Sequence, residues 1–195
     1  MKKILLLPLS FLLLASCAFN NKFLQPTQLP TSLTSINLPT AKGEVVAKIN
    51  PDNYQPTLFD TDGNELELDY TITSVVFKSN SGNKLNGWFL SPKGQKKDIT
   101  LLHLHGNSGF LFSQIQAILP LVKQGFPVFM FDYSGYGFSS GEATRDNIIK
   151  DATSALSYLK SQSNFPNQKI VIYGQSLGGN LAAIISSAVE EEIAG

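Results

Sequence analysis

The sequence predicts an α/β fold in which an antiparallel N-terminal hairpin precedes a mostly parallel sheet with crossover helices. Three short, nearly continuous apolar runs carry this prediction, at residues 99–104, 127–131 and 169–173. Such runs are typical of strands that are buried on both faces of a parallel sheet. Helical segments separate the three runs, and this alternation indicates a sheet whose parallel strands are joined by right-handed crossovers.

The remaining elements follow from periodicity and turn residues. Apolar residues recur at a spacing of three to four over residues 146–160, and residues 112–123 form a second apolar helical stretch. Two strand-like runs, 71–78 and 85–90, flank a turn rich in Asn and Gly and predict the hairpin. We expect a further hairpin around Asp62–Gly63.

The composition restricts the classes of function. The chain has 195 residues, and its 15 Lys and Arg residues are balanced by 15 Asp and Glu residues. This balance provides no basic surface for a phosphate backbone, so we expect no nucleic-acid partner. The single cysteine excludes an intrachain disulfide and a cysteine-rich zinc site. We expect no cofactor.

The first residues have the pattern of a targeting segment. Residues 1–16 combine a basic start, an apolar run and small residues, as in a secretory signal peptide. The apolar run is shorter than the ~20 residues that span a bilayer. The segment Leu14-Ala15-Ser16-Cys17 resembles the lipobox of bacterial lipoproteins. This resemblance implies that Cys17 becomes a lipidated N-terminus, anchored in the cell envelope at the outer membrane or a membrane facing the periplasm. The alternative is a plain signal peptide with an incidental cysteine.

The segment that follows is poor in charge and rich in Pro, Ser and Thr. Proline removes backbone donors, so residues 17–43 are predicted to form a semi-extended, lipid-anchored tether. The alternative is a partly ordered arm that lies on the domain. We assign residues 44–195 to the folded domain.

The strongest chemical motif is Gly174-Gln175-Ser176-Leu177-Gly178, a G-x-S-x-G pattern between a strand and an apolar helix. This sharp turn lifts the Ser176 hydroxyl clear of the sheet, and Gly174 and Gly178 avoid clashes there. The backbone N–H of Leu177 then becomes a donor to a developing oxyanion. The alternative is a glycine-rich turn that only packs tightly.

A second motif, His105-Gly106-Asn107-Ser108-Gly109, follows the strand at residues 99–104. With both motifs the chain resembles the α/β-hydrolases, particularly single-domain serine hydrolases with an H-G-N-x-G loop. The resemblance implies that the backbone N–H of Asn107 is the second oxyanion donor. Gly106 lets the backbone approach the substrate closely.

The two histidines offer another interpretation of the same strand. His103 and His105 lie two residues apart, so both face one side of the strand, where they could bind a metal. No Asp or further His lies nearby in the sequence to complete a ligand set. We therefore expect no metal site and interpret His105 as a residue that braces the loop.

Residues 131–139 resemble the D-x-R-G-x-G-x-S segment of the same family. Ser134 stands where arginine is usual, which removes a buried charge partner and affects the packing of the loop. Asp132 precedes the nucleophile in the chain, whereas the acid of this fold follows it. We therefore expect a structural role for Asp132.

The sequence lacks two parts of the expected machinery. A serine hydrolase of this fold presents its residues in the order Ser, Asp or Glu, then His. No histidine follows Ser176, and residues 190–192, all Glu, lie at the end of a helix that should carry them away from the hydroxyl. We expect the chain to be the N-terminal portion of a hydrolase domain, with its acid and base beyond residue 195 and the last strand left as a sheet edge.

These observations favour a serine hydrolase that acts on esters, thioesters or peptides through an acyl-enzyme. Its partners would be a small-molecule or acyl substrate and the membrane that holds the lipidated N-terminus. Two alternatives remain open: a non-catalytic surface lipoprotein that binds a ligand, and a truncated, inactive gene product.

Overall fold

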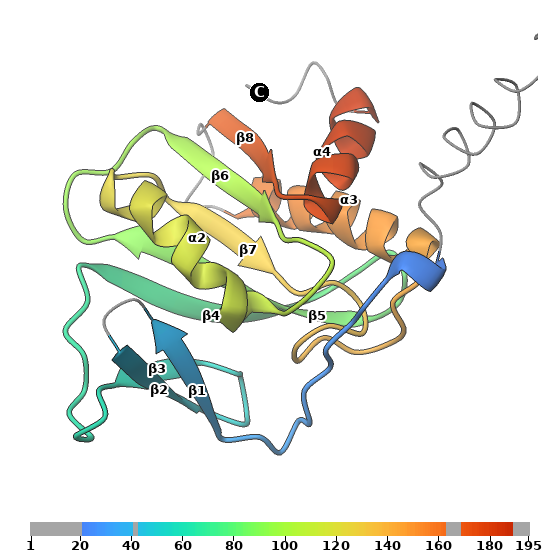
Figure 1. The fold of residues 1–195 in the computed structure, drawn as a ribbon. Helices are drawn as coiled ribbons and strands as arrows, with labels where there is room; N and C mark the ends of the chain where they lie inside the picture. The colour runs from blue at the N-terminus through green and yellow to red at the C-terminus, as the bar shows by residue number, and fades with distance from the viewer. Residues whose placement is uncertain (1–20, 41–42, 163–168, 189–195) are drawn as a thin grey trace, which may run out of the picture.

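A sheet of five strands forms the centre of the molecule (Figure 1). The computed structural model describes residues 21–40, 43–162 and 169–188. The strands of the central sheet are β4 (Tyr70–Lys78), β5 (Lys84–Pro92), β6 (Ile99–Leu104), β7 (Val128–Phe131) and β8 (Lys169–Gly174). Their spatial order is β4-β5-β7-β6-β8.

The pairing of the strands confirms the predicted fold class. The hairpin β4–β5 is antiparallel and joins β7 in antiparallel register, while β7, β6 and β8 are parallel to one another. All four residues of β7 are buried, which explains its uninterrupted apolar sequence. In the described part of the chain β8 is an edge strand, and Tyr173 on it is 42% exposed.

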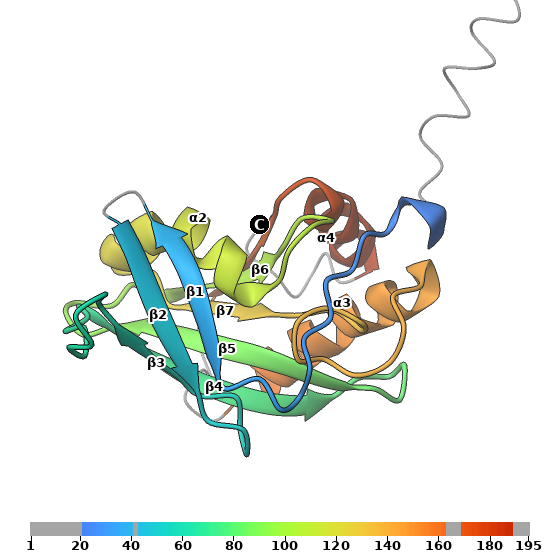
Figure 2. The ribbon, with the colours of Figure 1, turned by 60° about the horizontal axis from the view of Figure 1, so that its bottom comes forward.

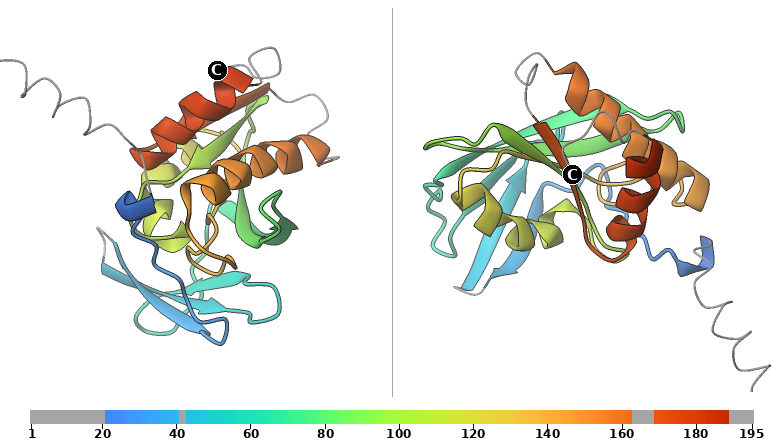
Figure 3. Two further views of the ribbon diagram at one scale, coloured as in Figure 1. Left: turned by 90° about the vertical axis from the view of Figure 1, so that its right-hand side faces the viewer. Right: turned by 90° about the horizontal axis from the view of Figure 1, so that it is seen from above.

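Three helices cover the two faces of this sheet. Helix α2 (Leu111–Lys123) connects β6 to β7, α3 (Arg145–Ser161) connects β7 to β8, and α4 (Leu177–Ala188) follows β8. Helix α2 packs in one hydrophobic core, and α3 and α4 pack in the other, on the opposite face (Figure 3). The Thr144 side chain caps α3 by accepting a hydrogen bond from the Asn147 N–H.

A second, smaller sheet lies on the α2 side of the molecule (Figure 2). Its strands are β1 (Ser35–Thr40), β2 (Gly43–Ile49) and β3 (Pro56–Phe59), paired antiparallel in that order. Leu38, Ala47 and Ile49 are buried in the same core as Trp88 of β5. This core explains why a segment with few long apolar runs is nevertheless ordered.

The structure differs here from the predicted tether. After a short 3-10 helix, η1 (Asn21–Phe23), the chain crosses the domain surface and enters β1. Pro39 does not prevent strand formation, because β1 is an edge strand and needs fewer backbone donors. The described residues of this segment therefore form an arm that lies on the domain.

The hairpin expected around Asp62–Gly63 is also only partly formed. Phe59 and Glu65 make a single antiparallel bridge, whereas β3 takes β2 as its strand partner. Asp60 closes the intervening turn by accepting hydrogen bonds from the backbone N–H groups of Asp62 and Asn64.

The N-terminal targeting segment lies outside the described residues, as does Cys17. Within the part of the chain that the structure describes, none of the helices combines the length and apolar character needed to cross a bilayer.

Candidate active site

Ser176 occupies the sharp turn between β8 and α4. Its φ of 54° lies in the left-handed region, which is uncommon for a residue other than glycine, and its side chain is exposed. A Cβ at Gly174 would overlap the backbone of Gly178, and a Cβ at Gly178 would overlap the carbonyl oxygen of Leu104. The two glycines therefore allow the strained turn, and Leu177 begins the helix immediately after it.

The loop after β6 lies directly against this turn. A Cβ added at Gly106 would lie 3.8 Å from the Cβ of Ser176 and 3.6 Å from the carbonyl oxygen of Gln175. Within residues 21–40, 43–162 and 169–188, neither the Asn107 nor the Leu177 backbone N–H has a hydrogen-bond acceptor. Two unused backbone donors thus belong to segments that meet at Ser176.

The N-terminal arm fixes the side chain of Asn107 from both ends. The side-chain amide of Asn107 donates to the carbonyl oxygen of Phe23 at 2.6 Å, and its Oδ1 accepts from the Gln25 N–H at 3.1 Å. The Tyr136 hydroxyl donates to the Asn107 carbonyl oxygen at 3.0 Å. The arm and Tyr136 together hold Asn107, whose backbone N–H is the oxyanion donor predicted from the sequence.

The same arm continues across the neighbouring loops. The Gly137 N–H donates to the carbonyl oxygen of Thr27, and the Leu29 N–H donates to the carbonyl oxygen of Gly137. Closer to the N-terminus, the Arg145 N–H donates to Oδ1 of Asn21. No motif in the sequence assigned this arm to the site; isolated apolar residues such as Leu24 and Leu29 in a segment rich in Pro, Ser and Thr were the available signal.

Asp132 has the structural role expected for it. Its side chain is buried and accepts hydrogen bonds from the backbone N–H groups of Leu111 and Phe138, which begin α2 and fix the following loop. Burial raises the pKa of Asp132 to about 7, and burial lowers the pKa of His105 to about 4. His105 Nε2 lies 3.8 Å from Asp132 Oδ1, but a neutral imidazole at neutral pH makes no ion pair with it.

The two histidines differ in their surroundings. Nδ1 of His105 lies 2.7 Å from the Gly106 carbonyl oxygen, and the Tyr133 hydroxyl donates to the His105 carbonyl oxygen. Both ring nitrogens of His103 are buried without a hydrogen-bond partner among the described residues. Burial, with a smaller contribution from His105, lowers the pKa of His103 to about 3. In the described part of the chain no group of three or more His, Cys, Asp and Glu side chains is arranged to hold a metal ion.

Ser134, at the position where arginine is usual, is accommodated by a polar network. Its N–H donates to Oδ2 of the buried Asp151 at 2.7 Å, and its hydroxyl accepts from the side-chain amide of Asn83 at 2.8 Å. The hydroxyls of Ser79 and Ser81 donate to the other oxygen of Asp151. Four hydrogen bonds therefore keep this loop packed without a cationic partner.

The described residues bring together only part of the expected machinery. Ser176, Gly106, Asn107 and Leu177 gather at one end of the sheet. Within the described ranges, no hydrogen bond links the Ser176 hydroxyl to a histidine. The glutamates at residues 190–192 lie outside these ranges.

Comparisons with known proteins bear on the fold. A family model described as "alpha/beta hydrolase fold" matches residues 99–195. Among solved structures, an esterase from Pyrococcus furiosus, Pf2001, superposes with a TM-score of 0.54 and 28% identity, covering 64% of this chain and 49% of that one. Both findings support the fold class predicted from the sequence.

The chain is also similar in sequence to proteins from bacteria and plants. The uncharacterized protein YfhR of Escherichia coli O157:H7 is 34% identical over 128 residues, which cover 64% of this chain and 45% of YfhR. The alpha/beta hydrolase domain-containing protein WAV2 of Arabidopsis thaliana is 30% identical over 120 residues, which cover 61% of this chain and 39% of WAV2. The chain thus spans less than half the length of these relatives.

Proposed function

Since the chain has the α/β-hydrolase fold, we propose that it belongs to a serine hydrolase that cleaves carboxylic esters through an acyl-enzyme on Ser176. The observation that carries the proposal is the exposed Ser176 with a φ of 54°, held between β8 and α4. A strained, exposed serine at a strand-to-helix turn is the arrangement in which this fold presents its nucleophile. The esterase Pf2001 supports esters over thioesters and peptides as the substrate class.

The proposed reaction has two halves. As Ser176 Oγ attacks the carbonyl carbon, a base takes the hydroxyl proton and the carbonyl oxygen becomes an oxyanion. Collapse of this intermediate expels the alcohol, which takes the proton from the base. Water then attacks the acyl-enzyme in the same way and releases the acid, which restores Ser176.

The oxyanion would be stabilised by the backbone N–H groups of Leu177 and Asn107. Neither N–H has an acceptor among the described residues. Leu177 follows Ser176 directly in the chain, and Asn107 follows Gly106, which lies against the Ser176 turn. Loss of one such donor typically reduces the rate by ~10²–10³-fold. The donor at Asn107 would depend on the arm, because Phe23 and Gln25 hold its side chain.

The base and its acid partner are assigned outside the described residues. His105 has its Nδ1 against the Gly106 carbonyl oxygen and its Nε2 near Asp132, while His103 is buried in the sheet. Neither imidazole is exposed for proton transfer to Ser176. The proposal therefore requires an imidazole and a carboxylate that the described residues do not place beside Ser176.

The proposal also includes attachment to a membrane through Cys17. Asn21, whose side chain accepts a hydrogen bond from the first residue of α3, is only four positions after Cys17. A fully extended segment of this length spans at most about 14 Å. A lipid on Cys17 would therefore hold the face that carries the arm close to the membrane surface, where acyl esters are available as substrates.

A fluorophosphonate probe on the full-length protein tests the nucleophile. We expect covalent labelling that is lost in Ser176→Ala and retained in Ser187→Ala, which removes an exposed serine of α4. Labelling that persists in Ser176→Ala would refute the assignment of the nucleophile. An unlabelled native protein would favour the non-catalytic ligand-binding alternative.

A metabolic lipid label tests the anchor separately. Labelling of the native protein and its loss in Cys17→Ser are the expected results. A label that still attaches to the Cys17→Ser protein would refute the proposed anchor and leave the proposed chemistry unaffected.

A further inference from the structure

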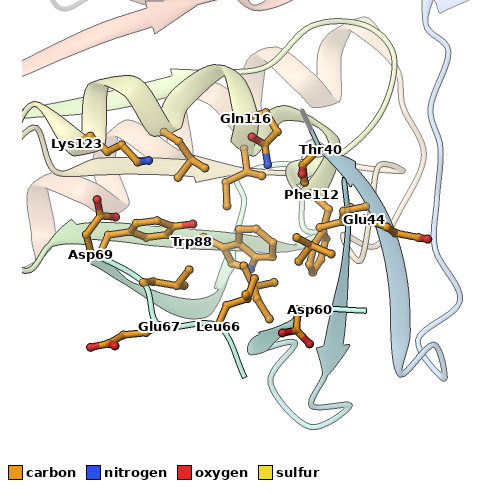
Figure 4. A pocket seen from close by; sticks show the side chains of 17 residues that line it. Thr40, Glu44, Asp60, Leu66, Glu67, Asp69, Trp88, Phe112, Gln116 and Lys123 are labelled. Atoms are coloured by element: carbon orange, nitrogen blue, oxygen red, sulfur yellow. The ribbon is translucent and has the colours of Figure 1, made fainter. Parts of the chain in front are cut away.

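A pocket of about 590 Å³ lies between helix α2 and the three-stranded sheet (Figure 4). Its walls are mostly apolar and come from both sides, including Leu38 and Leu58 of the small sheet and Ile115 and Leu119 of α2. None of the described residues of the Ser176 turn or of the loop after β6 lines it. Its size falls within the ~300–1,000 Å³ of typical small-molecule pockets.

Trp88 of β5 lies in the middle of the lining side chains (Figure 4). Its indole is fully buried and packs edge-to-face against Phe112, with the ring centroids 4.3 Å apart. In the described part of the chain its Nε1–H has no hydrogen-bond acceptor. An indole nitrogen can only donate, and a buried donor without an acceptor is costly, so this position favours a ligand oxygen.

The rim of the pocket carries an excess of negative charge. Among the described lining residues are the carboxylates of Glu44, Asp60, Glu67 and Asp69 and one cationic side chain, Lys123 (Figure 4). None of these five groups forms an ion pair with another described residue. The rim therefore attracts a cation and repels an anion, to an extent limited by solvent screening.

We propose that this pocket binds an amphipathic cation. The apolar body of the ligand would fill the space between α2 and the small sheet, and an acceptor oxygen would take the Trp88 Nε1–H. An amine or quaternary ammonium group would lie at the carboxylate rim. The mostly apolar walls disfavour a highly polar ligand, and the rim disfavours a fatty acid or another anionic amphiphile. This site does not depend on the chemistry proposed for Ser176.

Trp88 is the only tryptophan of the 195 residues. Its emission in the full-length protein is the part of the signal that is lost in Trp88→Phe, and this part serves as the probe. Three decanamides, each with an amide oxygen as acceptor, make a matched set of ligands. They end in a dimethylaminopropyl, a hydroxypropyl or a carboxyethyl group, and they would be titrated against the full-length protein below their micelle-forming concentrations. We expect a saturable change in Trp88 emission and an affinity for the cation that exceeds that for the anion by about 5- to 10-fold.

Two sets of variants make the result specific. The double variant Glu67→Gln/Asp69→Asn should abolish the preference for the cation. The control Asp98→Asn/Asp146→Asn should retain it, because it changes the net charge equally but at exposed positions away from the pocket. Leu119→Phe, which fills part of the cavity, should weaken all three ligands. Equal affinity for the cation and the anion would overturn the ligand class. The absence of a saturable change in emission with any of the three would overturn the site.

Discussion

The side-chain amide of Asn107 donates a hydrogen bond of 2.6 Å to the carbonyl oxygen of Phe23, which lies 84 residues earlier in the chain. The partner oxygen of the same side chain accepts from the Gln25 N–H. Asn107 is therefore held by backbone groups of the N-terminal arm, whose positions depend on how the arm lies on the domain. This contact connects the segment nearest the proposed lipid anchor with a proposed oxyanion donor.

Removing the Gln25 N–H should impair the site without unfolding the domain. Gln25→Pro deletes the donor to Asn107, whereas Gln25→Ala keeps it, and the Gln25 side chain itself is exposed. We expect Gln25→Pro to slow fluorophosphonate labelling of the full-length protein by about 3- to 10-fold, less than the ~10²–10³-fold for complete loss of a donor. Gln25→Ala should label at the native rate. Equal rates for the two variants would mean that the arm does not position Asn107.

The two glycines after Ser176 should respond oppositely to substitution by alanine. A Cβ at Gly178 would overlap the Leu104 carbonyl oxygen, and this backbone atom has no room to move because Leu104 belongs to the central β6. We expect Gly178→Ala to lower the free energy of unfolding by about 1–3 kcal/mol. Gly179→Ala meets only the Gly174 carbonyl oxygen at 3.7 Å and should gain up to about 1 kcal/mol of helix propensity. Urea denaturation of both variants measures the difference, and equal midpoints would contradict it.

The central elements of this fold were predictable because their signals are local. The hairpin of β4 and β5 has β-branched runs on each side of an Asn/Gly turn, and β6, β7 and β8 are short apolar runs buried by helices. The turn at Ser176 was predictable from its local G-x-S-x-G pattern between a strand and a helix. Gly174 is required by a contact with nearby Gly178, whereas Gly178 is required by a contact with the distant Leu104. The hydrogen bonds of the Asn107 side chain were not predictable, because its partners are backbone groups of a distant segment.

The N-terminal sheet, in contrast, was not predictable from local sequence signals. Residues 35–40 include Pro39 and few apolar side chains, so the sequence favoured a tether over a strand. The segment becomes strand β1 because Leu38 is buried with Ile49 and Trp88 in a core that exists only after folding. The pocket beneath α2 depends on the same tertiary packing, and no local pattern in the sequence indicated it.

Asp151 should be sensitive even to a change that conserves its shape. Both of its oxygens accept hydrogen bonds, from the Ser79 and Ser81 hydroxyls and from the Ser134 N–H, and the side chain is fully buried. In Asp151→Asn an NH₂ group would face a donor, and we expect a loss of about 1–3 kcal/mol in the free energy of unfolding. Asp146→Asn, which breaks only the exposed pair with Lys150, should cost about 0.3–0.5 kcal/mol. Chemical denaturation of the two variants tests this, and similar losses would contradict the proposed importance of the network.

The buried His103 should make the domain less stable in acid. Burial lowers its pKa from 6.5 to about 3, so between these values the unfolded chain binds a proton that the folded chain does not. Stability is therefore lost as the pH falls from 6.5 towards 3. His103→Leu removes this proton uptake, and its advantage in free energy of unfolding should grow by up to about 1.4 kcal/mol for each pH unit below 6.

The comparison with the native protein isolates His103 from the other buried groups. Asp132 acts in the opposite direction, because its pKa is raised from 3.8 to about 7, and its contribution is full below 3.8 and lost as the pH rises through 7. Asp132 and His105 are present in both proteins, so their effects largely cancel in the difference. Urea titrations of the native protein and His103→Leu at pH 7, 6, 5 and 4.5 provide the measurement. A difference that stays constant over this range would mean that His103 keeps an ordinary pKa in the folded chain.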